Sequence, residues 1–382
     1  MKSSEPLHID IVESFPAGFG FRMGISHGLA TRSRSISVVT RIVSSGGIAG
    51  YGESVPREYV TGETPQSVLE TCAVLSTKLR GQTFDSPGEV AAYLRHLSNR
   101  GDIAHLPAAR CTVDLALLDC AGRHWEMSAA DIIGLTPVLD ELYYSLVLPL
   151  FPLDELEQFA AQTAPFGFHE VKVKIDAGDP TERLDIVRRI FGPGVEIRVD
   201  ANCSWSPEDA PAFLHSLAER DIVSIEQPFS RDSLEQSARI RGTTPVLVTF
   251  DESVNSVADV RRAAGMKACD IVNVRVSKCG GLTGAAAVRD EALRCGLGVQ
   301  LGAQVGESCI LTAAGAFLAS ATPEFRWIEG AFGTHLLMED ICLDEIRFGN
   351  GGRFRAPGGT GLGVEPDCEL LDNARKRASG GE

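Results

Sequence analysis

Residues 170–176 read EVKVKID, and apolar and polar side chains alternate along them. This period of two is typical of a β-strand, in which successive side chains point to opposite faces. Lys172 and Lys174 would therefore share one face, and the apolar side chains between and beside them would share the other. A solvent-exposed sheet face is the simplest explanation of such a lysine pair, so its meaning depends on the sequence around the strand.

Strand-like runs of this kind recur from Tyr143 onwards and alternate with helical stretches. The polar residues that end the runs after the first are 25 to 27 residues apart. One strand, one loop and one helix fit this length, and eight such units with parallel strands make a (β/α)8 barrel. The eight runs are YYSLVLP (143–149), EVKVKID (170–176), EIRVDAN (196–202), IVSIEQP (222–228), VLVTFDES (246–253), IVNVRVSK (271–278), GVQLGAQ (298–304) and FRWIEGA (325–331).

The predicted barrel departs from the ideal at its two ends. The step from Tyr143 to Lys174 is longer than the others, and little helix-forming sequence follows Glu329. We therefore expect an α/β fold with a modified (β/α)7β barrel of the TIM type. A doubly wound open sheet shares the alternation, but no glycine-rich GxGxxG turn follows the first run.

The first 138 residues have a different pattern. Residues 35–54, SISVVTRIVSSGGIAGYGES, predict two strands joined by a Ser/Gly turn, and the segment from about Pro65 to Met127 is helical in pattern. We expect residues 1–138 to form an α+β domain and residues 139–340 to form the barrel. The turn-rich residues 341–382 are expected to return and pack on the first domain.

The composition is that of a globular protein, with 44% apolar residues and a net charge of −15 over 382 residues. This acidity disfavours nucleic acids and anionic membranes as partners, because both bind clustered Lys and Arg side chains. The sequence shows no signal-peptide pattern and no run of about 18 apolar residues, so we expect a cytoplasmic protein. Its 10 cysteines are scattered without a CxxC motif, and we expect reduced thiols.

The carboxyl ends of parallel barrel strands meet at one mouth of the barrel, where active sites lie. A single aspartate at a strand end often only caps the next helix or turns the chain. Three carboxylates on consecutive strands, however, repel one another strongly unless a cation holds them. Asp200, Glu226 and Asp251 therefore predict a site for Mg²⁺, with Mn²⁺ as an alternative, and zinc is disfavoured because no His or Cys accompanies them. The polar residues that end the runs are, in order, Lys174, Asp200, Glu226, Asp251, Lys278, Gln304 and Glu329.

The lysines acquire a role at such a site. Lys174 precedes the three carboxylates and Lys278 follows them, so the two would face each other across the metal. Lys172 would place a second positive charge beside Lys174. That charge favours the neutral form of Lys174, the form that can act as a base. A divalent ion that polarises a substrate carboxylate, with a lysine on each side, can remove the proton next to that carboxylate and return one.

The motifs KVKID, VDAN, IEQP, FDES and SKCGGL, in this order and spacing, resemble the enolase superfamily, and within it the muconate lactonizing enzyme subgroup. The resemblance extends to GYGESVPREYVTGET, TVDLALLDCAGR, LLMEDI and GGTGLGVEPD, and so spans nearly the whole chain. It implies a capping domain, formed by the N- and C-terminal segments, over a modified barrel. It also implies metal ligands at Asp200, Glu226 and Asp251, an acid and base pair at Lys174 and Lys278, and the first lysine of the subgroup's KxK motif at Lys172.

For function, the resemblance implies a Mg²⁺-dependent enzyme that removes the proton α to a substrate carboxylate through a metal-stabilised enediolate. A cycloisomerase, or a racemase or epimerase of an amino-acid derivative, is expected first. A dehydratase of the o-succinylbenzoate synthase type is an alternative, as is, in a different class, a barrel that binds metal and acid without catalysis. The seventh strand, LGAQVGES, has no His, which disfavours the mandelate racemase branch, and IEGAFG lacks the Asp-x-Asp motif of dipeptide epimerases.

Specificity in this superfamily comes from a mobile loop of the capping domain, which the resemblance places at FPAGFGFRMGISHG, residues 15–28. The expected partner is a small-molecule carboxylate, and the resemblance implies a homo-oligomer, either a dimer or an octamer. Arg275 and Gln304 depart from the family pattern and leave the substrate open. The expected substrate contacts are Arg22, His27, Arg57, Tyr59, Asn202, Gln304 and Glu329.

Overall fold

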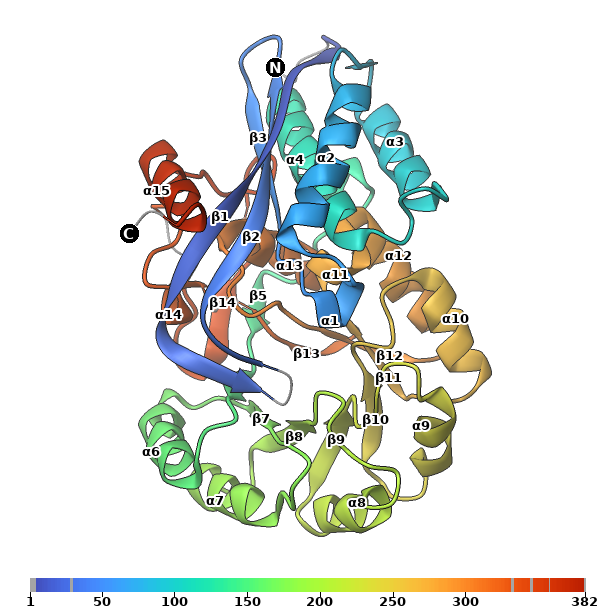
Figure 1. Cartoon of the computed structure of the whole chain (residues 1–382), viewed down its shortest axis with the longest axis vertical. Coiled ribbons are helices and arrows are strands. Elements are labelled where there is room, and N and C mark those ends of the chain that lie inside the picture. Colours follow the sequence, from blue (N-terminus) through green and yellow to red (C-terminus); the bar gives the residue numbers. More distant parts are fainter. Residues whose placement is uncertain (1–4, 28–29, 331–332, 344–345, 357, 381–382) are drawn as a thin grey trace.

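The computed structural model describes residues 5–27, 30–330, 333–343, 346–356 and 358–380. A curled sheet of parallel strands with helices outside it forms one half of the molecule, and a cap of sheet and helices forms the other (Figure 1). The expected combination of a barrel and a capping domain is confirmed.

The barrel sheet has eight parallel strands, and their order in space follows the chain from β6 to β13. The backbone N–H of Ser145, just before β6, donates to the carbonyl of Ile328 at the end of β13 (2.8 Å), which joins the first strand to the last. The strands are β6 (Leu146–Leu148), β7 (Glu170–Lys174), β8 (Glu196–Asp200), β9 (Ile222–Glu226), β10 (Leu247–Phe250), β11 (Ile271–Val274), β12 (Gly298–Leu301) and β13 (Phe325–Ile328).

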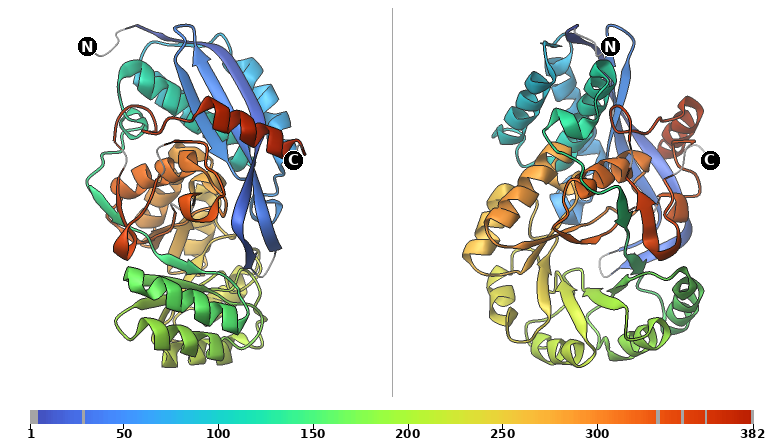
Figure 2. Two further views of the ribbon diagram at one scale, coloured as in Figure 1. Left: turned by 90° about the vertical axis from the view of Figure 1, so that its left-hand side faces the viewer. Right: turned by 180° about the vertical axis from the view of Figure 1, so that it is seen from behind.

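Helices connect each barrel strand to the next and cover the outside of the sheet (Figure 2). They are α6 (Leu153–Thr163), the 3-10 turn η1 (Ala164–Phe166), α7 (Thr181–Phe191), α8 (Ala210–Glu219), α9 (Leu234–Ile240), α10 (Val257–Gly265), α11 (Val276–Cys279), α12 (Gly281–Arg294) and α13 (Cys309–Ser320). The chain thus has the predicted (β/α)7β order. None of the described helices is long and apolar enough to cross a membrane.

The alternation in β7 has a structural cause. Val171 and Val173 are fully buried under the outer helices, whereas Lys172 and Lys174 point toward the barrel interior and its carboxylates. Lys172 is 1% exposed and the Lys174 side chain is 12% exposed. The simple explanation of the lysine pair as a solvent-exposed sheet face is therefore wrong.

The cap contains a four-stranded antiparallel sheet in the order β3-β2-β1-β4. A Cβ at Gly52 would lie 2.1 Å from the Thr112 carbonyl, and one at Gly50 would lie 2.1 Å from the backbone nitrogen of Cys120, so helix α4 packs directly on the backbone of β3. The strands are β1 (Leu7–His27), β2 (Ala30–Ser44), β3 (Ala49–Ser54) and β4 (Thr83–Phe84), and the helices are α1 (Glu58–Thr61), α2 (Pro65–Leu79), α3 (Pro87–Asn99), α4 (Pro107–Trp125) and α5 (Ala129–Ile132).

The predicted lid loop forms the second half of β1. Residues up to His27 are strand and pair with β2, with a register shift between Gly20 and Ile25. Phe15, Ala17, Phe19 and Phe21 are buried, which is the period of two of a strand, whereas Met23 beyond them is exposed. Gly18 allows close packing, because a Cβ there would lie 2.8 Å from the backbone nitrogen of Ala378. The expectation of an irregular loop is corrected for residues 15–27, which are strand, because the glycines obscured this alternation, and Gly28 lies outside the described residues. The role of this stretch as a closing lid stays a prediction.

The C-terminal segment contacts both halves of the molecule. Strand β14 (Arg353–Arg355) pairs with β5 (Glu141–Tyr143) beside the barrel. Along the chain, the short elements α14 (Gly333–Leu336) and η2 (Asn350–Gly352) precede β14, and the last helix follows it. That helix, α15 (Cys368–Ala378), lies across the strands of the cap in the left view of Figure 2. Arg377 on α15 donates from Nε to the carbonyl of Gly18 in β1 (3.2 Å).

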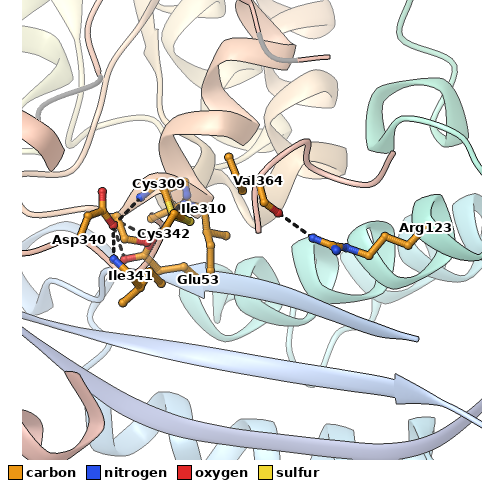
Figure 3. Close-up of a disulfide and its surroundings, with 10 residues drawn as sticks. Glu53, Arg123, Cys309, Ile310, Asp340, Ile341, Cys342 and Val364 are labelled. Carbon is orange, nitrogen blue, oxygen red and sulfur yellow. Dashed lines mark hydrogen bonds between the residues drawn. A yellow bond between two sulfur atoms is a disulfide. The ribbon is translucent and has the colours of Figure 1, made fainter. Parts of the chain in front are cut away.

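Two cysteines form a disulfide, Cys309–Cys342, with a Cα–Cα distance of 6.5 Å (Figure 3). The expectation that all cysteines are reduced is wrong for this pair. The two residues are 33 positions apart and share no motif, and only the return of the C-terminal segment brings Cys342 to the first residue of α13. Asp340 holds this junction by accepting from the backbone N–H groups of Cys309 (3.1 Å) and Ile341 (2.7 Å).

Candidate active site

Three carboxylates occupy the carboxyl ends of neighbouring barrel strands. Asp200 and Glu226 are the last residues of β8 and β9 and are partners in the register of the parallel sheet. Asp251 directly follows β10, and all three side chains are almost completely buried. Lys174 ends β7 as the register partner of Asp200. The structure therefore places these four predicted residues at one mouth of the barrel.

Lys278 reaches the same carboxylates from a helix. Strand β11 ends at Val274, and Lys278 lies in the short helix α11 that follows. Its buried Nζ lies 2.9 Å from Asp251 Oδ1 and donates to the carbonyl of Val254 (2.7 Å). The prediction of a lysine at a strand end is corrected, because only the first four residues of IVNVRVSK are strand and the next turn of chain is helical.

Lys172 bridges three carboxylates inside the barrel. Its Nζ lies 2.9 Å from Asp200 Oδ2, 2.9 Å from Glu226 Oε1 and 3.0 Å from Glu329 Oε1. Burial alone would lower the pKa of Lys172, but the three carboxylates outweigh it and hold the pKa above its ordinary value. The ammonium is therefore a permanent cation shared among three partners. Its expected influence on Lys174 stays a prediction.

The carboxylates stay ionised for the complementary reason. Burial would raise the pKa of Asp200, but Lys172 and Lys174, whose Nζ is 2.6 Å from Oδ2, hold that pKa well below its usual range. Burial would likewise raise the pKa of Glu329, yet Lys172 and Arg198 lower it to about 2. Arg198 Nη1 lies 2.7 Å from Glu329 Oε1, so this pair closes the charged interior on the side of β13.

Asp251 has a second cationic partner in Arg275. The Nη2 of Arg275 donates to Asp251 Oδ2, and its Nη1 donates to Gln304 Oε1 (2.8 Å). Arg275 and Gln304, the two residues that depart from the family pattern, are thus hydrogen-bonded to each other. Burial lowers the pKa of Lys278 to about 8, and the nearby charge of Arg275 acts in the same direction.

A layer of polar side chains, of which only Lys172 was predicted, lies beneath the barrel mouth. Asn273 and Gln300 donate to the two oxygens of Glu226 (2.9 and 2.7 Å), and Ser224 and Thr249 share a hydrogen bond of 2.7 Å. Each member lies two residues before a residue at the mouth, which is the spacing of side chains on one strand face. The runs EIRVD and IVNVR therefore contained the signal. The layer consists of Lys172, Arg198, Ser224, Thr249, Asn273 and Gln300, all buried.

The three carboxylates offer oxygen ligands without His or Cys, which suits Mg²⁺ or Mn²⁺. Within residues 5–27, 30–330, 333–343, 346–356 and 358–380, no three His, Cys, Asp or Glu side chains are arranged to hold a metal ion. Lys174, Arg275 and Lys278 lie against the aspartates instead. Among the described residues, Asp251 Oδ1 has an ion-pair contact with Lys278 Nζ (2.9 Å) but accepts no hydrogen bond, and the buried Glu252 Oε2 accepts none either. The donor set fits a hard divalent ion, whose binding requires these cations to move aside.

A cavity of about 310 Å³ is lined by residues of both the barrel and the cap. At its barrel side, Lys174 Nζ donates to Asn202 Oδ1 (2.8 Å), and Asn202 Nδ2 donates to Glu252 Oε1 (3.3 Å). Burial, and then the charge of Asp200, raise the pKa of Glu252 to about 7. The predicted residues that line the cavity are Lys172, Lys174, Asn202, Gln304 and Glu329 from the barrel and Arg57 and Tyr59 from the cap.

Other predicted residues are placed elsewhere. Arg22 does not line the cavity, because it donates to the carbonyls of Leu337 (2.9 Å) and Met338 (3.4 Å) and so ties β1 to the C-terminal segment. Lys278 and the three carboxylates are not among the lining residues, since they lie deeper in the barrel. The side chain of His27 lies outside the described residues.

Several lining side chains were not predicted. Arg32 reaches the cavity from β2, and four phenylalanines line another part of the wall. These residues belong to separate elements and share no motif, so no sequence signal pointed to them. The aromatic set is Phe159 of α6, Phe166 of η1, Phe168 before β7, and Phe348 of the C-terminal segment.

Two family models match the chain. The model described as "Mandelate racemase / muconate lactonizing enzyme, N-terminal domain" matches residues 21–134. The model described as "Enolase C-terminal domain-like" matches residues 155–370. Together the two matches cover more than half of the chain.

Individual relatives agree with these matches. The hydrophobic dipeptide epimerase of Citrifermentans bemidjiense is 31% identical over 344 residues, which covers 86% of this chain and 90% of the relative. The structure of N-succinyl Arg/Lys racemase from Bacillus cereus has a TM-score of 0.88 at 26% identity and covers 98% of both chains. A dipeptide epimerase from Enterococcus faecalis, complexed with Mg and L-Leu-L-Tyr, has a TM-score of 0.85 at 23% identity and covers 96% of this chain and 100% of its own, a likeness of fold alone.

Proposed function

The chain belongs to the mandelate racemase / muconate lactonizing enzyme family of the enolase superfamily, and from this membership we propose that it is a racemase or epimerase that inverts the carbon next to a substrate carboxylate. The enolase-superfamily reaction class is supported by relatives that are named racemases, epimerases and cycloisomerases. The assignment of individual residues is our own inference from the geometry.

One observation carries the proposal: two lysines lie on opposite sides of one carboxylate cluster. Lys174 Nζ lies 2.6 Å from Asp200 Oδ2, and Lys278 Nζ lies 2.9 Å from Asp251 Oδ1. Glu226 ends the strand between those of the two aspartates. A substrate carbon above this cluster would have an ammonium or amine on each face, which is what removal of a proton from one face and return to the other requires.

Asp200, Glu226 and Asp251 would hold Mg²⁺, and a bound divalent ion would supply the positive charge that makes a proton next to a carboxylate removable. Lys174 lines the cavity and is the proposed carrier of the proton on its side. Lys278 carries the proton on the other side. Lys172 stays charged and bridges Asp200 and Glu226, so it is a positioning residue in this proposal.

The experiment is solvent exchange of the α proton in D2O with Mg²⁺. N-acyl amino acids, dipeptides, muconate and other acids are incubated as single enantiomers where they are chiral, and products are followed by NMR and polarimetry. We expect deuterium at the α carbon together with loss of optical activity. Each of Lys174→Ala and Lys278→Ala should abolish inversion and leave exchange with at most one enantiomer, because one base remains on one face. Lys78→Ala, an exposed lysine of the cap, should behave as wild type.

The outcomes separate the alternatives. Ring closure of muconate without α exchange of amino-acid derivatives would assign a cycloisomerase, and loss of water would assign a dehydratase. Full inversion by Lys174→Ala would refute its role as a base. Binding of Mn²⁺ and acids without exchange across the whole panel would identify a barrel that binds without catalysis.

A further inference from the structure

We propose that Arg275 and a divalent ion compete for Asp251, and that binding of the ion releases the Arg275 guanidinium to the substrate carboxylate. The inference rests on the proposed function, in which Asp200, Glu226 and Asp251 hold that ion and the substrate carboxylate lies at the barrel mouth. It adds an anion-binding residue to the site, and it couples the binding of the acid to the binding of the metal.

Arg275 lies between the carboxylate cluster and the cavity. It directly follows β11, its side chain is 10% exposed, and it lines the cavity. Its Nη2 donates to Asp251 Oδ2 and lies 3.8 Å from Glu226 Oε1. The guanidinium therefore contacts two of the three proposed metal ligands, and a metal ion on Asp251 Oδ2 would displace it.

The guanidinium also has donors that the protein leaves unused. Nε and Nη2 form one edge of the group, and such an edge matches the two oxygens of a carboxylate. Nη2 is held by Asp251, whereas Nε is buried and has no hydrogen-bond partner among the described residues. Release from Asp251 would therefore free the whole edge for a carboxylate.

Gln304 marks the same wall of the cavity as a place for an acceptor. Its Oε1 accepts from Arg275 Nη1 (2.8 Å), which holds the far side of the guanidinium and leaves the Nε edge to turn. Gln304 lines the cavity, and its Nε2 is a second buried donor that lacks a partner in the described part of the chain. Buried donors are normally satisfied, so two unsatisfied donors beside a cation point to an anionic ligand.

The charge of Arg275 requires a new partner once the metal is bound. A guanidinium keeps its charge at any ordinary pH. The ion pairs of Arg275 are with Asp251 and Glu226, both of which the metal would take, and Gln304 is neutral. Glu329 is already paired with two other cations. A buried cation without its partner is strongly unfavourable, and a substrate carboxylate in the cavity would supply the missing charge.

Lys278 also contacts Asp251 but is not placed to bind a substrate carboxylate. It is completely buried, does not line the cavity and donates to the carbonyl of Val254 (2.7 Å). Lys174 lines the cavity from β7, on the other side of the cluster, where it is the proposed base. Of the cations that contact Asp251, Arg275 is therefore the one that release directs into the cavity.

The consequence is a coupling between the metal and the acid. While Asp251 holds the guanidinium, acid binding gains little from Arg275. Once the metal holds Asp251, the guanidinium contributes to acid binding. By thermodynamic linkage, the factor by which the metal raises the affinity for the acid is also the factor by which the acid raises the affinity for the metal.

The first experiment titrates Mn²⁺ alone into wild type and Arg275→Gln by isothermal titration calorimetry. We expect the variant to bind Mn²⁺ at least 10-fold more tightly, because no guanidinium competes for Asp251. Arg34→Gln, which removes an exposed arginine of the cap, should bind Mn²⁺ as wild type does. Equal or weaker Mn²⁺ binding by Arg275→Gln would overturn the inference.

The second experiment titrates N-acetyl-α-aminoisobutyrate, a carboxylate without an α proton, with and without saturating Mn²⁺. Mn²⁺ should raise the affinity of wild type for this acid at least 100-fold, and the increase should be at least 10-fold smaller in Arg275→Gln. An equal loss of acid affinity in Arg275→Gln with and without Mn²⁺ would indicate a fixed charge and would overturn the release.

A crystal structure of wild type with Mg²⁺ tests the inference without a variant. Arg275 separated from Asp251 would support it, and Arg275 still bonded to Asp251 beside the bound ion would overturn it. None of these measurements involves proton transfer, so they are independent of the proposed reaction. Coupled binding without α-proton exchange would refute the racemase and support the role of Arg275, whereas exchange without coupling would do the reverse.

Discussion

Glu53 offers a sharp test of how the cap is joined to the barrel. This buried carboxylate of β3 accepts from Ser37 Oγ (2.7 Å), Ser308 Oγ (2.6 Å) and the backbone N–H of Ser308 (3.1 Å). Ser308 is the N-cap residue of α13, so one cap side chain binds the first turn of a barrel helix next to the disulfide (Figure 3). We predict that Glu53→Gln changes the pH dependence of stability.

The magnitude follows from the carboxyl group's titration. Burial raises the pKa of Glu53 from an ordinary value of 4.5 to about 7, although Ser308 and Ser37 oppose the change. The folded state therefore holds the proton more tightly than the unfolded chain, and stability falls as pH rises between these two values. The difference corresponds to roughly 3 kcal/mol at full ionisation. Glutamine is neutral at every pH, so the variant should lack this loss.

The assay is urea unfolding of wild type and Glu53→Gln from pH 5 to pH 8. At pH 5 we expect the variant to be less stable by about 1–2 kcal/mol, because its amide nitrogen cannot accept from the Ser308 donors. Between pH 5 and pH 8 the difference in unfolding free energy should change by roughly 3 kcal/mol in favour of the variant, because only wild type loses stability as Glu53 ionises. Asp340 and Glu307 also titrate nearby, but both proteins contain them, so their effect cancels in the comparison. The control variant Glu235→Gln, on an exposed helix face, should have the same pH profile of stability as wild type. Parallel pH profiles for wild type and Glu53→Gln would refute the reasoning.

Three further predictions concern stability. Lys172→Met removes the cation shared by three buried carboxylates, so the free energy of unfolding should fall by about 3–5 kcal/mol, and an unchanged urea midpoint would contradict the pairing. The double variant Cys309→Ser, Cys342→Ser opens a loop of 33 residues and should lower the free energy of unfolding by about 3–4 kcal/mol. Reducing wild type with dithiothreitol should have the same effect. Equal unfolding midpoints with and without the reductant would show that the bond does not form. Gly52→Ala should lose at least about 2 kcal/mol, because its Cβ would lie 2.1 Å from the backbone of α4, whereas Gly101→Ala has open space and should leave thermal unfolding unchanged. A stable Gly52→Ala protein would mean that the sheet and helix can separate.

The barrel could be predicted because its signals are local. Each strand run alternates or is continuously apolar over a few residues, and the regular spacing reflects the length of one strand, loop and helix. Lys174, Asp200 and Glu226 end their strands, so knowing the strands placed these side chains at one mouth of the barrel. The same alternation also predicts that Arg198 and Asn273 point into the barrel, because each lies two residues before a residue at the mouth.

The missed features depend on contacts between distant segments. The lid residues form a strand because Phe15 and Phe19 pack in the cap core and Gly18 packs on α15. Arg22 looked like a substrate contact but donates to carbonyls more than 300 positions away. Arg32 reaches the cavity only because the β1–β2 hairpin extends to the barrel mouth.

The sequence by itself determined the strands, their parallel order and the set of charged residues at their ends, because side-chain alternation and unit length belong to short stretches of chain. Only the tertiary structure decided how these charges pair: Lys172 binds three carboxylates, Arg275 binds Asp251, and Lys278 approaches from a helix. It also decided that Arg32 and Arg57, from separate segments of the cap, line the same cavity. The physical reason is that Coulomb energy and burial depend on distances through space between segments far apart in the chain, and these distances exist only in the folded protein.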